Sequence, residues 1–255
     1  MSWKYFYASV AGTSHKERNI PLQDSINVQV LNKSDSEKII IIAVADGAGS
    51  ASHSHIGSNL ACKLITNKVK KWLEQDNQIE QLTAEIIEVW LANIRTIFYK
   101  VANGLSLDSI RQLAATLLVS IVASEYSFFF QIGDGAIVIK SDNEYKCIFW
   151  PQTGEYANTT YFITDNDISK NLMVALEKEQ VKEFAMFTDG IQSIALEYIN
   201  KKPYEPFFRP FFNVGNDLSV GLNNNFSNNL SSFLNSERVN ARTDDDKTLL
   251  IATCT

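Results

Sequence analysis

Aspartates stand at the ends of several predicted strands, where their carboxylates could act together. Three of them are directly followed by glycine, and the five positions are Asp24, Asp46, Asp134, Asp189 and Asp245. Because Asp-Gly is also a common tight-turn dipeptide, any one of these positions alone favours a plain turn. Four or five of them at the ends of separate buried strands indicate more. If those strands share one sandwich, several acidic side chains converge on one edge.

Converging carboxylates repel one another, and in the absence of cations this repulsion raises their pKa values. Hard divalent cations satisfy such a group, and a ligand set of oxygen atoms alone favours Mg²⁺ or Mn²⁺ over zinc. Two such ions would nearly balance the charge of three or four aspartates. The sequence therefore predicts a dinuclear site about 3.5–4 Å across, whose bridging water is acidified into a nucleophile.

The elements that would hold these aspartates follow from hydrophobic periodicity. Apolar runs predict three N-terminal strands, Trp3–Val10, Ile26–Leu31 and Lys38–Ala45. Apolar residues at helical spacing then predict two long helices, about Ile56 to Leu73 and Ile87 to Val101. Four short strand candidates separated by turns predict an antiparallel meander over Ala114–Ala123, Ser127–Gly133, Ala136–Lys140 and Tyr145–Trp150.

After a loose stretch over residues 151–180, the last elements are a strand, two helices and a final strand, expected at Lys182–Thr188, Ile191–Asn200, Leu218–Leu234 and Thr248–Thr253. This order is not βαβ alternation, so the sequence predicts an α+β fold in a single domain, residues 1–255. Two antiparallel sheets placed face to face, with helices outside each, would give a four-layer α-β-β-α sandwich.

Composition excludes several classes of protein. The 255 residues carry 23 Lys and Arg against 29 Asp and Glu, a formal charge of −6, which argues against binding to a nucleic-acid backbone. The N-terminus lacks the pattern of a signal peptide, and no apolar run approaches the ~20 residues that a bilayer requires. We therefore expect a cytoplasmic protein without a membrane partner. Neither a disulfide framework nor a Cys-x5-Arg phosphate loop is expected from the three cysteines, Cys62, Cys147 and Cys254.

Six short motifs follow one another along the chain, and five of them contain a strand-end aspartate. They are Gln23-Asp24-Ser25, Ala45-Asp46-Gly47-Ala48-Gly49-Ser50, Ala115-Thr116-Leu117-Leu118, Ile132-Gly133-Asp134-Gly135, Phe187-Thr188-Asp189-Gly190-Ile191 and Asp245-Asp246-Lys247-Thr248. In this order, over about Tyr7 to Ala252, the chain resembles the metal-dependent PPM-type (type 2C) Ser/Thr protein phosphatases. It is most similar to their short, single-domain bacterial branch. Singly each motif is modest, but six in order are specific.

The resemblance implies a metal centre and a reaction. Asp46 would bridge two metals, the Gly47 carbonyl would reach one of them, and Asp189 and Asp245 would complete the other. Asp134 would bind a third, weaker metal. The ions would be Mg²⁺ or Mn²⁺. Metal-activated water would attack phosphoserine or phosphothreonine directly, without a phosphoenzyme.

The resemblance also implies a role for Asp24, while Gln23 and Ala48 depart from the family pattern. Asp24 would orient metal-bound water without binding the metal. Gln23 stands where many members carry Glu, so the second metal would lose a charge. Ala48 stands where some members have a histidine that protonates the leaving group, and that role would pass to a metal-bound water or stay unfilled.

Contacts to the substrate are also implied by the resemblance. The family's phosphate-binding arginine falls at Asn19, so Arg18 could contact the phosphate instead, with His15 as its rival. The stretch between Asp134 and Asp189 is shorter than in many members, and residues 154–164 resemble the end of the family's flap. A reduced substrate flap is therefore expected.

Two features lie outside the motifs. His53 and His55 are expected to be solvated or supporting side chains, because an i, i+2 spacing does not aim both rings at one ion. The aromatic run from Pro206 to Phe212 is either a connection packed on the core or a docking ridge for a protein partner.

These observations predict a monomeric, cytoplasmic, Mg²⁺- or Mn²⁺-dependent protein Ser/Thr phosphatase. Its partner would be a phosphoprotein substrate, and family context implies a cognate Ser/Thr kinase. The alternative is a catalytically weak or silent module that binds phosphoproteins and regulates them. Gln23 and the missing arginine at position 19 motivate this alternative, whereas the retained Asp46, Asp189 and Asp245 count against it.

Overall fold

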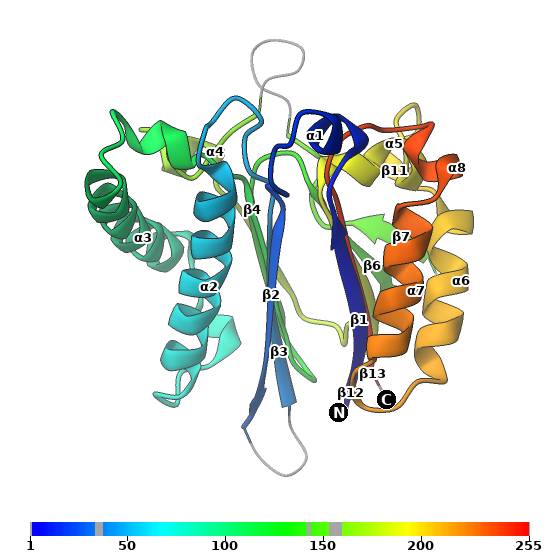
Figure 1. Ribbon diagram of the computed structural model, residues 1–255. Helices are drawn as coiled ribbons and strands as arrows, with labels where there is room; N and C mark the ends of the chain where they lie inside the picture. The colour runs from blue at the N-terminus through cyan, green and yellow to red at the C-terminus, as the bar shows by residue number, and fades with distance from the viewer. Residues whose placement is uncertain (1, 34–37, 142–143, 153–159, 255) are drawn as a thin grey trace.

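The computed structural model describes residues 2–33, 38–141, 144–152 and 160–254. Two β-sheets lie face to face at its centre, and helices cover the outer face of each sheet (Figure 1). The layers follow the order helix, sheet, sheet, helix. This arrangement confirms the predicted α+β sandwich of four layers.

The first sheet has five strands in the order β2-β3-β4-β5-β8, and all neighbouring pairs are antiparallel. Its strands are β2 (Ser25–Asn32), β3 (Lys38–Ala45), β4 (Leu117–Val122), β5 (Ser127–Ile132) and β8 (Met173–Glu177).

The second sheet has six strands in the order β12-β1-β13-β9-β6-β7. Its pairs are antiparallel except for the short parallel pairing of β12 with β1. Its strands are β1 (Trp3–Val10), β6 (Ala136–Ser141), β7 (Glu144–Cys147), β9 (Glu183–Phe187), β12 (Gly221–Leu222) and β13 (Lys247–Cys254). A separate hairpin pairs β10 (Leu196–Glu197) with β11 (Lys202–Pro203).

Long helices form the outer layers (Figure 1). On the first sheet, α2 (Ser54–Leu73) packs against β2 and β3, and α3 (Ala84–Gly104) packs on α2. On the second sheet, α6 (Glu205–Asn216) and α7 (Asn224–Leu234) pack against β13 and β1. Within the described ranges, no helix combines the length and the apolar character needed to cross a membrane.

Shorter helical segments connect these elements. The α-helical ones are α1 (Thr13–Glu17), α4 (Ile168–Asn171), α5 (Gln192–Ala195) and α8 (Glu237–Asn240). The 3₁₀ turns are η1 (Ile79–Gln81), η2 (Ile110–Leu113) and η3 (Asp189–Ile191).

Strand β3 explains why its sheet is covered on both faces. Successive side chains of a strand point to opposite faces. Ile40 and Ile42 lie in the core between the two sheets, while Ile39 and Ile41 lie in the core under α2 and α3. All four are at most 1% exposed. A run of isoleucines without alternating polar residues is therefore what a strand buried on both faces requires.

The chain exchanges sheets where the sequence predicted one continuous meander. β4 and β5 pair in the first sheet, whereas β6 pairs with β7 and β9 in the second. The crossing occurs at residues 133–135, between β5 and β6. The Gly-Asp-Gly sequence there serves as a sheet-to-sheet connection, so the prediction of a hairpin at this point is wrong.

Three local predictions also differ from the structure. The helix expected over Ile191–Asn200 ends with α5, because the chain turns into β10 at Leu196. The stretch expected to be loose contains β8, which pairs with β5. The aromatic run from Pro206 is not a loop but lies within α6, where Phe208 and Phe212 are buried against the second sheet.

Candidate active site

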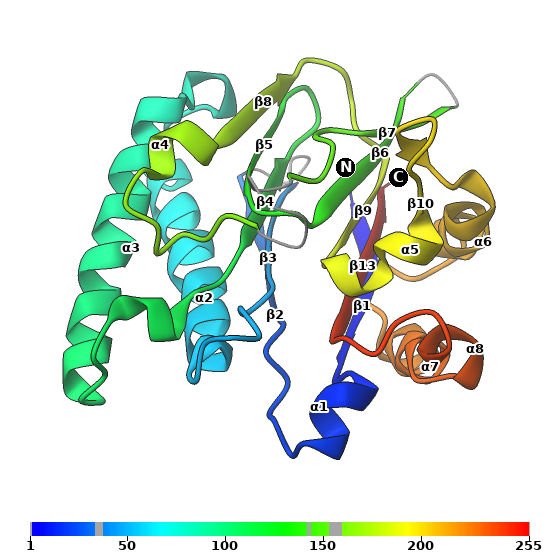
Figure 2. The same ribbon diagram turned by 90° about the horizontal axis from the view of Figure 1, so that it is seen from above.

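The aspartates selected from the sequence lie next to strand ends at one end of the sandwich. Asp46 follows β3, Asp134 lies in the crossing from β5 to β6, and Asp189 begins η3 after β9. Asp24 directly precedes β2, and Asp245 lies just before β13. This end also carries α1 and α5, at the top of Figure 1 and facing the viewer in Figure 2. Both sheets therefore contribute carboxylates to one place.

Three of these carboxylates form a tight cluster. Asp46, Asp134 and Asp189 each offer one oxygen, and these oxygens lie within 4.8 Å of one another. The three residues are separated by 88 and 55 positions in the chain but come together because their strands end at the same edge. Oxygens this close can bind a common hard cation.

Asp46 is held by its backbone. Its N–H donates to Thr116 Oγ1 at 2.9 Å, and its carbonyl accepts from the Thr116 N–H at 2.8 Å. At Gly47, a Cβ atom would lie 2.8 Å from the Gln23 carbonyl oxygen and 2.9 Å from Ser54, which is too close for any other residue. The Asp46 turn is thereby locked between neighbouring loops.

Asp134 is held by two glutamines. The buried Gln131 side chain donates from Nε2 to the carbonyls of Gly133 and Gly135, at 2.9 Å and 2.7 Å. The Gln192 side chain donates to the Asp134 carbonyl. These bonds fix the crossing loop on both sides of the carboxylate. Neither glutamine was predicted from the sequence, because each resembles an ordinary strand or helix residue.

Asp24 is buried beside the cluster. Its Oδ2 accepts hydrogen bonds of 2.8 Å from the hydroxyls of Thr188 and Thr248, while its Oδ1 is buried without a hydrogen-bond partner among the described residues. One oxygen is therefore fixed by two hydroxyls, and the carboxyl group also interacts with that of Asp46.

Asp245 and Asp246 have different surroundings although they are adjacent. Asp245 is exposed, and its charge acts on Asp46 and Asp189. Asp246 is 2% exposed and points away, toward the N-terminal segment. Its Oδ1 accepts from Gly12 N at 2.7 Å and lies 2.9 Å from His15 Nδ1, and its Oδ2 accepts from Gln23 N at 2.6 Å.

The candidate site residues near the N-terminus, His15, Arg18 and Gln23, also differ in their surroundings. His15 is buried against Asp246, and the two lie with Asp245 in a second group of oxygen and nitrogen atoms within 4.8 Å of one another. Arg18 is exposed, and its Nε donates to the Ser14 carbonyl at 3.0 Å. Gln23 is buried, and its side-chain Oε1 has no partner among the described residues.

Burial and mutual repulsion raise the pKa values of the clustered carboxyls. Burial is the largest cause for each of them. It raises the pKa of Asp24 to about 7 and that of Asp189 to about 8, with like charges adding to both. The pKa of Asp46 rises well above its ordinary value, through burial and then the charges of Asp24, Asp189, Asp245 and Asp134. Burial also raises the pKa of Asp134.

These observations fit a divalent cation. The donors are oxygen atoms, and buried oxygens of Asp24 and Asp134 have no hydrogen-bond partner among the described residues. Carboxyls that are costly to ionise on their own become favourable ligands once positive charge is present. The residues present are therefore suited to Mg²⁺ or Mn²⁺.

His53 and His55 lie beside the Asp46 turn. Their rings stack with centroids 6.2 Å apart, and His53 Nδ1 bonds to the Ser52 hydroxyl at 2.7 Å. Neither histidine falls in a group of potential metal ligands within the described ranges. Residues 153–159 of the segment that resembles the flap lie outside the described residues.

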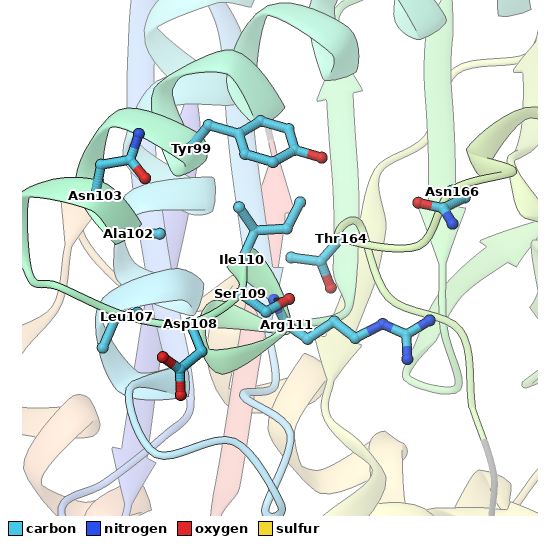
Figure 3. Close-up of a pocket in the computed structure, with 10 residues that line it drawn as sticks. All are labelled: Tyr99, Ala102, Asn103, Leu107, Asp108, Ser109, Ile110, Arg111, Thr164 and Asn166. Atoms are coloured by element: carbon cyan, nitrogen blue, oxygen red, sulfur yellow. Dashed lines mark hydrogen bonds between the residues drawn. The ribbon is translucent and has the colours of Figure 1, made fainter.

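A polar hollow of about 560 Å³ lies elsewhere, between the end of α3 and η2. Figure 3 shows that Asp108 and Arg111 extend in opposite directions at its edges, while Thr164 lies between them. It contains none of the clustered aspartates.

Comparisons with known proteins show the family of the chain. The family model described as protein phosphatase 2C matches residues 11–235. Serine/threonine-protein phosphatase 3 of Escherichia coli (strain K12) is 35% identical over 254 residues, which cover 99% of this chain and 98% of that protein.

Solved structures share the fold at low sequence identity. The catalytic domain of the serine/threonine protein phosphatase PstP, in complex with two manganese ions, superposes with a TM-score of 0.64 at 15% identity, covering 99% of this chain and 98% of that one. The serine/threonine phosphatase Stp1 from Staphylococcus aureus superposes with a TM-score of 0.62 at 13% identity, covering 100% of this chain and 96% of that one.

Proposed function

The chain belongs to the protein phosphatase 2C family and is a protein serine/threonine phosphatase, and from this premise we propose how its residues act. The clustered aspartates would hold a dinuclear Mg²⁺ or Mn²⁺ centre, which would acidify the water used to hydrolyse phosphoserine and phosphothreonine. The observation that carries this proposal is the convergence of Asp46, Asp134 and Asp189 within 4.8 Å, beside buried carboxylate oxygens that lack protein partners.

The metal ligands are assigned from the cluster and the family motifs. Asp46 would serve both ions, the Gly47 carbonyl would contribute to one, and Asp189 and Asp245 would hold the other. Asp134 would hold a third ion. When bound, the ions supply the positive charge that acidifies water and neutralises the substrate phosphate.

Asp24 positions the attacking water. Its Oδ2 is fixed by Thr188 and Thr248, and its Oδ1 is left to accept a hydrogen bond from water. A carboxylate in that position can also accept the proton that water loses as it attacks phosphorus. The neighbouring Gln23 has a buried amide oxygen without a partner among the described residues, so it offers a hydrogen-bond acceptor without adding charge.

Arg18 is our candidate for binding the substrate phosphate. The His15 ring is already bound to Asp246, whereas only the Nε of Arg18 has a hydrogen-bond partner among the described residues. The outer nitrogens of a guanidinium suit two phosphate oxygens. Replacement of Arg18 by alanine should raise KM for a small aryl phosphate more than it lowers kcat.

Hydrolysis of an aryl phosphate tests the proposal. Activity should require Mn²⁺ or Mg²⁺, vanish in EDTA and vanish in Asp46→Asn. Asp108→Asn, which removes a carboxylate from the distant polar hollow, is the matched control and should keep its activity. Full activity in Asp46→Asn would contradict the assigned role of that residue.

The wider assignment follows from the same reaction. We propose a monomeric cytoplasmic enzyme whose catalytic domain spans residues 1–255 with a reduced flap near 150–180, and whose substrates are phosphoproteins, including a cognate Ser/Thr kinase. A silent phosphoprotein-binding module is the alternative raised by Gln23 and Asn19. The whole-chain likeness to a protein named as a phosphatase does not favour it.

A further inference from the structure

A groove of about 800 Å³ lies between α5, α6, α7 and α8, on the right of Figure 1. Its floor is aromatic. The rings of Phe207, Phe211 and Phe233 pack on one another with centroids 5.4 to 6.4 Å apart, and each remains partly exposed. Phe207 also packs edge-on against the buried Phe208 at 5.0 Å, which anchors the floor to the core. A rigid apolar surface of this kind costs little entropy to bind against.

Two arginines form one edge of the groove. Arg238 and Arg242 are exposed, and neither forms an ion pair within the described ranges. The acidic residue that lines the groove, Glu197, lies 3.4 Å from Lys202 and is thereby balanced. The groove edge is therefore positive although the chain as a whole carries −6. An acidic ligand complements it.

The groove adjoins the loops that carry the metal ligands. Ser193 follows Asp189 by four residues, and Arg242 precedes Asp245 by three. Because consecutive Cα atoms are about 3.8 Å apart, these groove residues lie within roughly 11–15 Å of those aspartates. Ser193 Oγ also meets the Arg242 carbonyl at 3.5 Å, which joins the two segments. Three or four residues of extended chain span such a distance.

We propose that this groove binds the substrate protein itself, three to five residues from the phosphorylated side chain. An apolar side chain of the substrate packs on Phe207, Phe211 and Phe233, and neighbouring acidic side chains pair with Arg238 and Arg242. The proposal rests on the phosphatase function and specifies its substrates: phosphoproteins with an acidic and apolar segment beside the phosphorylated residue. The polar hollow at η2 carries no comparable assignment, because its edge holds both Asp108 and Arg111.

The test compares two phosphothreonine peptides. One carries Leu-Glu-Glu three residues away on both sides of the phosphothreonine, and the other carries Ala-Lys-Lys at the same places. The enzyme should prefer the acidic peptide in kcat/KM by about tenfold, as expected for two ion pairs of modest strength. The double variant Arg238→Glu/Arg242→Glu should lose or invert this preference. A small aryl phosphate cannot reach the groove, so its hydrolysis should not change.

The control changes the same charge elsewhere. Lys68→Glu/Lys71→Glu alters two exposed lysines on α2, on the opposite side of the molecule, and should keep the preference (Figure 1). Equal kcat/KM for both peptides in the unchanged enzyme, or an unchanged preference in the arginine variant, overturns the proposal. Loss of aryl phosphate hydrolysis in the unchanged enzyme would instead refute the phosphatase function. Fluorescence anisotropy of the labelled acidic peptide then still measures groove binding, which the arginine variant should weaken about tenfold.

Discussion

The Nδ1 atom of His15 lies 2.9 Å from the Oδ1 atom of Asp246, and both side chains are buried. Asp246 also accepts from the backbone N–H groups of Gly12 and Gln23. One carboxylate therefore fastens α1 and the Gln23-Asp24 pair to the loop that carries Asp245. Asp246 thereby helps to place Asp24 beside the clustered aspartates, although Asp246 itself is not part of that cluster.

Asp246→Asn should destabilise the protein. The amide keeps the shape of the side chain but replaces one acceptor oxygen with an NH₂ group, which cannot accept from the N–H donors around it. At least one buried hydrogen bond is therefore lost. We expect the free energy of unfolding, measured with urea in EDTA, to fall by about 2–4 kcal/mol. The control is Asp244→Asn, at an exposed residue nearby. It should change the free energy of unfolding by less than about 0.5 kcal/mol. An equal fall in the free energy of unfolding in both variants would show that Asp246 does not hold these segments together.

Thr248→Val should weaken the hold on Asp24. The valine removes one of the two hydroxyls that donate to the buried Oδ2, at a cost of roughly 1–3 kcal/mol in unfolding free energy. Because Asp24 is proposed to act on water, kcat for an aryl phosphate should fall while KM stays nearly constant. Thr253→Val is the matched control on the same strand, since its buried hydroxyl has no partner among the described residues. A similar fall in kcat in both variants would contradict the role of Asp24.

Gly190→Ala should damage the metal centre. A Cβ atom there would lie 1.9 Å from the Asp246 carbonyl oxygen, so the Asp189 and Asp245 loops would have to move apart. We expect a lower Tm in EDTA and weaker binding of Mn²⁺ by calorimetry. The control is Gly49→Ala beside the Asp46 turn, where a Cβ atom would meet no atom within 4 Å. It should leave both the Tm and the binding of Mn²⁺ unchanged. Normal Mn²⁺ affinity in Gly190→Ala would exclude this close packing as a determinant of the site.

The stability of the metal-free protein should fall as pH rises. Asp24 and Asp189 have pKa values of about 7 and about 8 in the folded chain, above the value of about 4 for an unfolded chain. Over that window the folded state retains protons that the unfolded state has released, so the free energy of unfolding decreases from about pH 4 to about pH 8. Cations favour the ionised carboxylates and offset this loss. The difference in Tm between Mn²⁺ and EDTA should therefore be larger at pH 7.5 than at pH 5.5, and an equal difference would contradict the raised pKa values.

Much of the fold was predictable because the strongest sequence signals were local. β1 and β3 have the bounds that were predicted. In β3 an unbroken apolar run buries the strand and the Asp-Gly that follows stops it, whereas β1 mixes buried and partly exposed residues. The assignment of β5 and β6 to different sheets was not predictable, because Gly-Asp-Gly serves equally in a hairpin and in a crossing. α6 was missed because Pro206 and Pro210 suggested a loop. Pro206 lies in the first turn, where its missing N–H costs nothing, and the phenylalanine spacing buries the helix.

The site was predictable by residue type but not by orientation. Asp46, Asp134 and Asp189 converge as their places at strand ends indicated. Asp245 and Asp246 are identical neighbours, so the sequence could not show that Asp246 is buried against His15 while Asp245 is exposed. That difference depends on the backbone at the start of β13 and on donors more than 220 residues earlier in the chain.

Calorimetric titration of the metal-free enzyme with Mn²⁺ tests the central claim most directly, because it measures the centre without depending on a substrate. We expect two tightly bound ions per chain at pH 7.5, with protons released on binding, and loss of at least one of them in Asp46→Asn. Absence of Mn²⁺ binding to the unchanged protein, or the same stoichiometry and affinity in Asp46→Asn, would contradict it.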